Sequence, residues 1–101
     1  MESVRQQKVS RLLQKEIGIL FQRSLSHLAA GNIITVTVVR IAPDLGFAKV
    51  YLSVFPEKEP KTMIAGLNEN IGEVTRTLYP IIKNQFRKMP EIRFYHDDSL
   101  D

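Results

Sequence analysis

Apolar and polar residues follow a helical spacing over the first part of the chain. Between residues 3 and 28, apolar side chains recur every three or four positions, which is typical of one buried face of a long helix. Gly31 and Asn32 then favour the end of this helix and a turn of the chain. The residues that form the predicted apolar face are Val9, Leu12, Leu13, Ile17, Leu20, Phe21, Leu25 and Leu28.

The spacing changes to strict alternation over residues 33–55, which predicts a β-hairpin. Two runs rich in β-branched residues are separated by Pro43, Asp44, Leu45 and Gly46. Pro43 suits the second position of a type I turn, and Gly46 suits its end. We expect one face of the hairpin to be buried through Ile34, Val36, Val38, Ala48, Val50, Leu52 and Val54.

A second helical pattern starts near Thr62 and resumes after Gly72, where we expect a bend. Pro80 falls on the outer side of this pattern and predicts a kink, because proline has no N–H to donate to the preceding turn. Met89 and Pro90 are expected to end this element, and residues 92–96 alternate as a last short strand. The order is therefore helix, hairpin, broken helix, strand.

Length and composition fit a single α+β domain over residues 1–101, with a three-stranded sheet packed on helices. The chain has 101 residues, of which 44% are hydrophobic, enough for one core only. It contains no cysteine, no apolar run approaching the roughly 20 residues of a membrane span, and no signal-peptide pattern at its start. We expect a cytoplasmic protein.

Basic side chains form two stripes, and the net charge of +3 favours an anionic partner. Those of the first helix fall within about a third of its circumference, opposite most of the apolar face. A solvated helix surface explains such a stripe equally well before other features are considered. The candidate RNA-binding residues are Arg5, Lys8, Arg11, Lys15 and Arg23 in the first stripe, with Arg76, Lys83, Arg87 and Lys88 in the second.

Residue sets that carry catalysis are missing from the sequence. The two histidines, His27 and His96, do not make a metal site, and there is no phosphate-binding glycine loop or nucleophile elbow. We therefore expect no enzyme activity, metal or cofactor. The remaining enzymatic hypothesis is a nuclease-like site at Asp44, Asp97 and Asp98, which would require magnesium-dependent RNA cleavage.

The predicted order of elements is that of a KH-type RNA-binding domain of the second topology, but no two glycines stand three residues apart, so its Gly-x-x-Gly loop is absent. This combination resembles the ribosome-binding factor A family of bacterial small-subunit assembly factors. Four segments carry the resemblance over nearly the whole chain: the opening helix from Arg5 to Ile17, the hairpin from Ile34 to Val54, Asn70-Ile71-Gly72, and the ending from Pro90 to Ser99.

The resemblance implies a non-catalytic protein that binds the free small (30S) ribosomal subunit and its 16S rRNA. It further implies assistance in late maturation and 5′-end processing of the precursor rRNA, especially in the cold. No membrane or small-molecule substrate is implied, and we expect a monomer. Many relatives continue into a flexible C-terminal tail, which is expected to be absent or trimmed in this chain.

Two positions depart from the family pattern around the break between the helices. The family has an Ala-x-Gly kink where this chain has Asn70, Ile71 and Gly72. Asparagine can cap a helix start, which predicts a physical substitute at Asn70. Pro80 is an added irregularity that is expected to move or share the bend.

A protein-interaction module on the same fold is the alternative function. It would dock another assembly factor through the hairpin face carrying Phe47, Tyr51 and Phe55, with little dependence on salt. For RNA binding, the aromatic residues that could stack on bases are Tyr51, Tyr79 and Tyr95, whereas Phe21, Phe86 and Phe94 are expected in the core.

Overall fold

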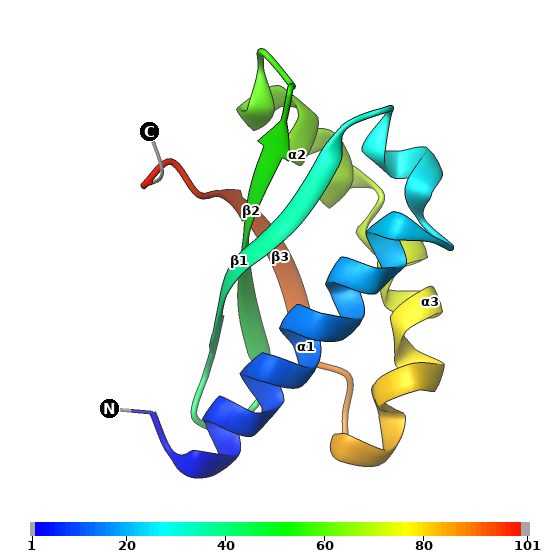
Figure 1. Cartoon of the computed structure of the whole chain (residues 1–101). Coiled ribbons are helices and arrows are strands. Elements are labelled where there is room, and N and C mark those ends of the chain that lie inside the picture. Colours follow the sequence, from blue (N-terminus) through cyan, green and yellow to red (C-terminus); the bar gives the residue numbers. More distant parts are fainter. Residues whose placement is uncertain (1, 100–101) are drawn as a thin grey trace.

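The computed structural model describes residues 2–99 and has one mixed sheet with all its helices on one side (Figure 1). The predicted order of elements is confirmed, with two short 3-10 turns added. The elements are α1 (Val4–Gln22), η1 (Ser26–Ala29), β1 (Ile33–Ile41), β2 (Phe47–Phe55), α2 (Pro60–Glu69), α3 (Ile71–Ile82), η2 (Lys83–Gln85) and β3 (Glu91–His96).

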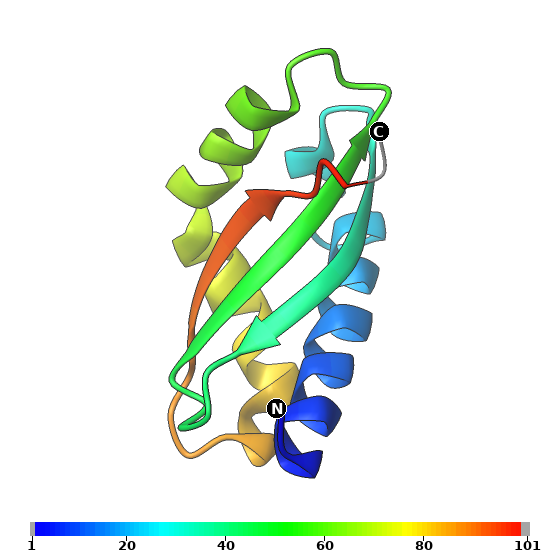
Figure 2. The ribbon, with the colours of Figure 1, turned by 90° about the vertical axis from the view of Figure 1, so that its left-hand side faces the viewer.

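The sheet has the order β1-β2-β3, with β1 and β2 antiparallel and β2 and β3 parallel. α1 packs on β1, while α2 packs on β3, and α1 also contacts α3. Figure 2 shows the opposite face of the sheet toward the viewer, and no helix covers it. The molecule therefore has two distinct broad surfaces, the outer side of the helices and the open face of the sheet.

A β-bulge in β1 makes the predicted set of inward-facing residues partly wrong. Val36 pairs with Leu52 and Val38 pairs with Tyr51, so Thr37 is an extra residue in β1. Because side chains alternate along a strand, one extra residue moves all later ones to the other face. Val39 is buried in place of Val38, which is only half-buried.

The first helix starts as predicted but ends earlier. Ser3 caps it, accepting the N–H of Gln6 at 3.1 Å, while the Gln6 side chain accepts the N–H of Ser3 at 2.8 Å. The prediction of a helix to residue 28 is wrong, because Arg23 leaves the helical conformation and η1 follows. This change of direction buries Leu25, whose exposed fraction is 1%.

The predicted break between the second and third helices is confirmed, at Asn70 rather than Gly72. The Asn70 side chain donates to the carbonyl of Gly66 at 2.9 Å, and its backbone N–H bonds the same carbonyl at 3.2 Å. Asn70 thus satisfies the end of α2, and the expectation that its side chain caps the start of α3 is wrong. Ile71 and Gly72 form the first turn of α3.

α3 continues past Pro80 for two residues and then gives way to η2. Pro80 is exposed, as predicted, so water can reach the carbonyl that lacks its helical partner. The expectation that the helix continues to Met89 is wrong, and residues 86–90 form a loop. Arg87 and Lys88 therefore lie on this loop and not on a helix face.

The hairpin turn runs from Ala42 to Leu45, with Pro43 at its second position as predicted. The N–H of Leu45 donates to the carbonyl of Ala42 at 2.8 Å, which closes the turn one residue before Gly46. Leu45 takes a left-handed conformation with φ of 63°, and its side chain packs against the core. This turn places Leu45 at the end of the molecule where α1 begins.

Candidate nucleic-acid interface

A ridge of exposed cations runs along the outer side of α1. The helix buries Val9 and Leu13 against the sheet, so residues on the opposite side of the helical turn face solvent. Lys8, Arg11 and Lys15 occupy that side, and all three are exposed. The predicted basic stripe therefore exists in space over this part of α1.

α3 lies beside α1 and runs in the opposite direction (Figure 1). Its exposed Arg76 lies close to the first turn of the helix, since a Cβ atom at Gly72 would be 3.3 Å from Arg76 Nη1. Lys83 is also exposed and begins η2. The second group of cations thus borders the same helical layer as the first.

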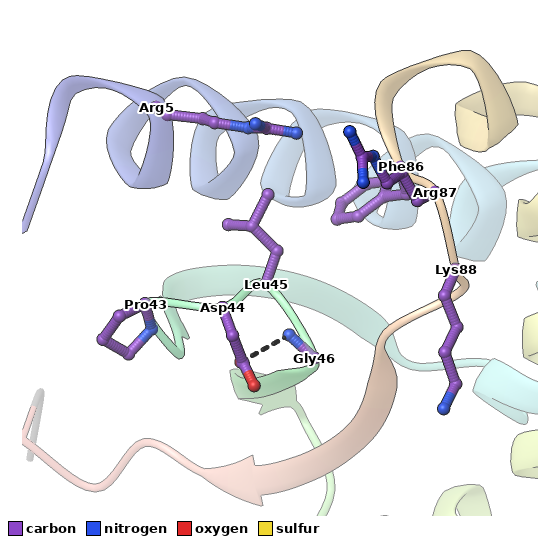
Figure 3. Close-up of a pocket in the computed structure, with 8 residues that line it drawn as sticks. All are labelled: Arg5, Pro43, Asp44, Leu45, Gly46, Phe86, Arg87 and Lys88. Atoms are coloured by element: carbon purple, nitrogen blue, oxygen red, sulfur yellow. Dashed lines mark hydrogen bonds between the residues drawn. The ribbon is translucent and has the colours of Figure 1, made fainter.

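The two groups meet at a cleft of about 500 Å³ near the hairpin turn. Figure 3 shows Arg5 extending from α1 toward Arg87, with Leu45 pointing up between α1 and the turn and Lys88 farther away along the loop. The one carboxylate in the lining belongs to Asp44, and its Oδ1 accepts the N–H of Gly46 at 2.9 Å. Three cations against one hydrogen-bonded carboxylate make this cleft suited to an anionic group.

Arg23 is exposed but lies away from this cleft. It follows the last residue of α1, so it is roughly 27 Å from Arg5 along the helix axis at 1.5 Å per residue. The predicted stripe therefore extends along the whole length of α1, with Arg5 at the end near the cleft and Arg23 at the opposite end. We call the nine exposed cations the helical cationic surface: Arg5, Lys8, Arg11, Lys15, Arg23, Arg76, Lys83, Arg87 and Lys88.

These positive charges are not neutralised within residues 2–99. The ion pair recorded in that range joins His27 Nε2 to Glu73 Oε2 at 2.8 Å, and it links η1 to α3. None of the lysines and arginines in this range has a carboxylate oxygen of another residue of the range within 4.0 Å. A surface of unpaired cations is available to phosphate groups without first breaking internal salt bridges.

Strand register brings together three cations that the sequence did not single out as binding residues, and it places two of the predicted stacking tyrosines beside them. Arg40 pairs with Lys49, and Lys49 pairs with Arg93, so three cations cross the sheet in one row. Tyr51 and Tyr95 are neighbours as well, with ring centroids 5.5 Å apart. Alternation in the second and last strands already indicated that Lys49 and Arg93 point outward, but the pairing was not visible in the sequence.

The remaining aromatic residues are divided between core and surface. Phe21 and Phe94 are buried with ring centroids 5.7 Å apart, as expected for core residues. Phe86 is half-buried and lines the cleft. Tyr79 is exposed on α3.

Residues 2–99 contain neither a cluster of metal-binding side chains nor a membrane-spanning helix. Within this range, no group of three or more His, Cys, Asp or Glu side chains is placed to hold a metal ion. No described helix combines the length and apolar character needed to cross a membrane.

The fold defines a KH-like α+β domain of type II topology, here without the Gly-x-x-Gly loop and with a cationic helical exterior. The family model described as ribosome-binding factor A matches residues 5–101. The chain belongs to this family.

Curated relatives agree with this assignment, and a solved structure shares the fold. The chain is 40% identical over 101 residues to ribosome-binding factor A of Christiangramia forsetii, covering 99% of the chain and 77% of the relative. It is 42% identical over 102 residues to that of Cytophaga hutchinsonii, covering 100% and 76%. The crystal structure of ribosome-binding factor A from Thermus thermophilus has the same fold, with a TM-score of 0.72 at 19% identity over 90% of this chain and 94% of the other.

Proposed function

We propose that this protein is a non-catalytic assembly factor that binds the free small (30S) ribosomal subunit and contacts its 16S rRNA through the helical cationic surface. The observation that carries the proposal is the absence of carboxylate partners for these cations among residues 2–99. Family membership supports a ribosomal partner. The natural ligand is then a phosphate backbone recognised by charge and shape.

The layout of the cations supports contact with a folded RNA surface. Lys8, Arg11 and Lys15 form a straight ridge on a rigid helix, whereas Arg87 and Lys88 lie on a loop beside the start of that helix. A rigid ridge keeps a constant spacing between phosphate contacts, and the cleft at its end can hold one further phosphate between Arg5 and Arg87. Binding of this kind fixes an orientation on RNA without reading base sequence.

In this role the protein assists late maturation of the subunit and processing of the precursor rRNA at its 5′ end, especially in the cold. The protein itself makes and breaks no bond in this role.

Co-sedimentation with isolated particles tests the choice of partner. The protein is mixed with small subunits, large subunits and assembled ribosomes over a series of salt concentrations. We expect salt-sensitive binding to free small subunits only. Equal binding to all three particles, or no binding at low salt, would overturn the proposal.

Genetic complementation tests the maturation role. In a strain that lacks its own ribosome-binding factor A and grows poorly in the cold, expression of this chain is expected to reduce the amount of 5′-unprocessed 16S rRNA. The charge-reversal variant Arg11→Glu/Lys15→Glu is expected to fail. Complementation by this variant at equal protein level would remove the ridge on α1 from the mechanism.

A further inference from the structure

The open face of the sheet carries side chains in rows that cross the strands. Register places Arg40, Lys49 and Arg93 in one row. The next row contains Val38, Tyr51 and Tyr95. No described helix covers these rows, which lie on the face turned toward the viewer in Figure 2.

Repulsion within the row of cations destabilises the free protein. All three side chains are exposed, and none has a carboxylate oxygen within 4.0 Å among residues 2–99. Neighbouring strands are about 4.8 Å apart, and like charges directly opposite each other destabilise a sheet. A ligand with regularly spaced negative charges would relieve this repulsion.

The tyrosine row offers a surface for flat rings. Tyr51 and Tyr95 are half-buried, and their ring planes differ by 31°. Lys49 Nζ lies 5.9 Å from the centroid of the Tyr95 ring, which joins the charged row to the aromatic one. Stacking on aromatic side chains beside a line of cations is how proteins bind single-stranded nucleic acids.

Two features of the same face limit what can bind. Glu91 pairs with Phe47 at one end of β3, and Asp97 follows the other end, with its Oδ2 accepting the Thr37 hydroxyl at 2.5 Å. The centre of the face is therefore cationic and aromatic, with carboxylates at its margins. Phe47 and Phe55 lie at opposite ends of β2, so they do not form one apolar patch with each other.

We propose that the open sheet face is a second nucleic-acid site, which binds a short single-stranded RNA segment. Its phosphates lie along Arg40, Lys49 and Arg93, and its bases stack on Tyr51 and Tyr95. The site is separate from the helical cationic surface, and it depends on the proposed function only for ribosomal RNA as the natural source of the strand.

Titration with an eight-nucleotide oligouridine tests this site without ribosomes. The chain has three tyrosines and no tryptophan, so the fluorescence of the unmodified protein comes from tyrosine, and two of the three tyrosines lie in the proposed site. Anisotropy of a fluorescein-labelled oligouridine measures the affinity in parallel. We expect binding and quenching with the oligouridine at low salt, and little quenching with a blunt duplex RNA of equal length, whose bases are already stacked.

Paired variants separate stacking from charge. Tyr51→Leu/Tyr95→Leu is expected to weaken oligouridine binding about tenfold or more. Tyr51→Phe/Tyr95→Phe is expected to preserve binding, because the ring faces remain.

The charge variant Arg40→Gln/Lys49→Gln/Arg93→Gln should make the slope of log affinity against log salt less steep by about 2, at about 0.7 per contact with a single strand. The matched controls are Tyr79→Leu for the rings and Lys58→Gln, at an exposed lysine outside both surfaces, for the charges, and both are expected to retain binding.

The outcomes distinguish this site from the proposed function. Loss of oligouridine binding in the sheet variants, with co-sedimentation governed by the helical variants, supports two separate sites. Oligouridine binding that survives the tyrosine and arginine changes, or is absent from the unmodified protein at low salt, overturns the sheet site whatever the subunits show. Failure to bind small subunits with intact oligouridine binding overturns the proposed function alone.

Discussion

The side chain of Asn68 helps to hold the edge strand β3 in place. Asn68, on α2, donates its Nδ2 to the carbonyl of Phe94 at 3.0 Å and accepts the N–H of Phe94 at 2.8 Å. Both backbone groups of a buried residue in β3 are thus paired by one amide at the side of the sheet away from β2. This contact, together with the pairing to β2, fixes the position of β3 and with it of Arg93 and Tyr95.

Replacing Asn68 with alanine is expected to lower the free energy of unfolding by about 1–3 kcal/mol, because two partly buried backbone groups lose their partners. Urea denaturation measures the change. Asn84→Ala, at an exposed amide in η2, is the control and is expected to stay within about 0.5 kcal/mol of the unmodified protein. Equal stability of the two variants would contradict the role of Asn68.

Asp97 predicts how stability responds to acid. Hydrogen bonds from the Ser99 hydroxyl, the Thr37 hydroxyl and the Ser99 N–H lower the pKa of Asp97 from 3.8 to about 2. A carboxyl group whose pKa is lower in the folded state than in the unfolded state stabilises the fold at pH values above the unfolded-state pKa. This contribution is lost as the pH falls toward 2. Asp97→Asn is therefore expected to show a weaker loss of unfolding free energy between pH 4 and pH 2.

Urea denaturation at several pH values in this window, together with a carboxyl NMR titration of Asp97, checks the expectation. Asp98→Asn is the control, since it removes the adjacent carboxylate and leaves the bonds to Thr37 and Ser99 in place. An Asp97 titration midpoint near 3.8 would contradict the hydrogen-bonded arrangement.

At the scale of elements, periodicity predicts where helices and strands are but not how they end. The start of α1, the hairpin and β3 follow from local signals such as Ser3 and Pro43. The end of α1 at Gln22 depends on burying Leu25 against other elements, and the bulge at Thr37 depends on the partner strand. Such features are set by tertiary packing, which a single sequence does not show.

Pro80 gives a prediction at the same scale. Pro80→Ala is expected to raise the free energy of unfolding by about 1–3 kcal/mol, because alanine can donate a helical hydrogen bond and favours the helix. Pro60→Ala is the control, since Pro60 is the first residue of α2, where the missing N–H has no helical partner to lose. Thermal and urea unfolding compare the two, and a loss of stability in Pro80→Ala would contradict the expectation.

At the scale of the whole molecule, the single sheet separates two candidate RNA surfaces. The sequence identified Lys8, Arg11 and Lys15 because they share a helical face with a regular spacing. It could not show that Arg5 meets Arg87 at a cleft, or that Arg40, Lys49 and Arg93 line up, because both depend on contacts between distant segments. The family resemblance in the sequence is confirmed, while the roles of the individual cations remain predictions.

The salt dependence of binding to free small subunits tests the central claim most directly. If roughly six cations contact phosphates, log affinity should fall with log salt at a slope of about −4 to −5. Arg11→Gln/Lys15→Gln is expected to reduce the steepness by about 2, whereas Lys58→Glu, which changes the net charge equally from outside the helical cationic surface, leaves it unchanged. Equal effects of the two variants would show that net charge alone governs binding and would contradict a defined RNA surface on the helices.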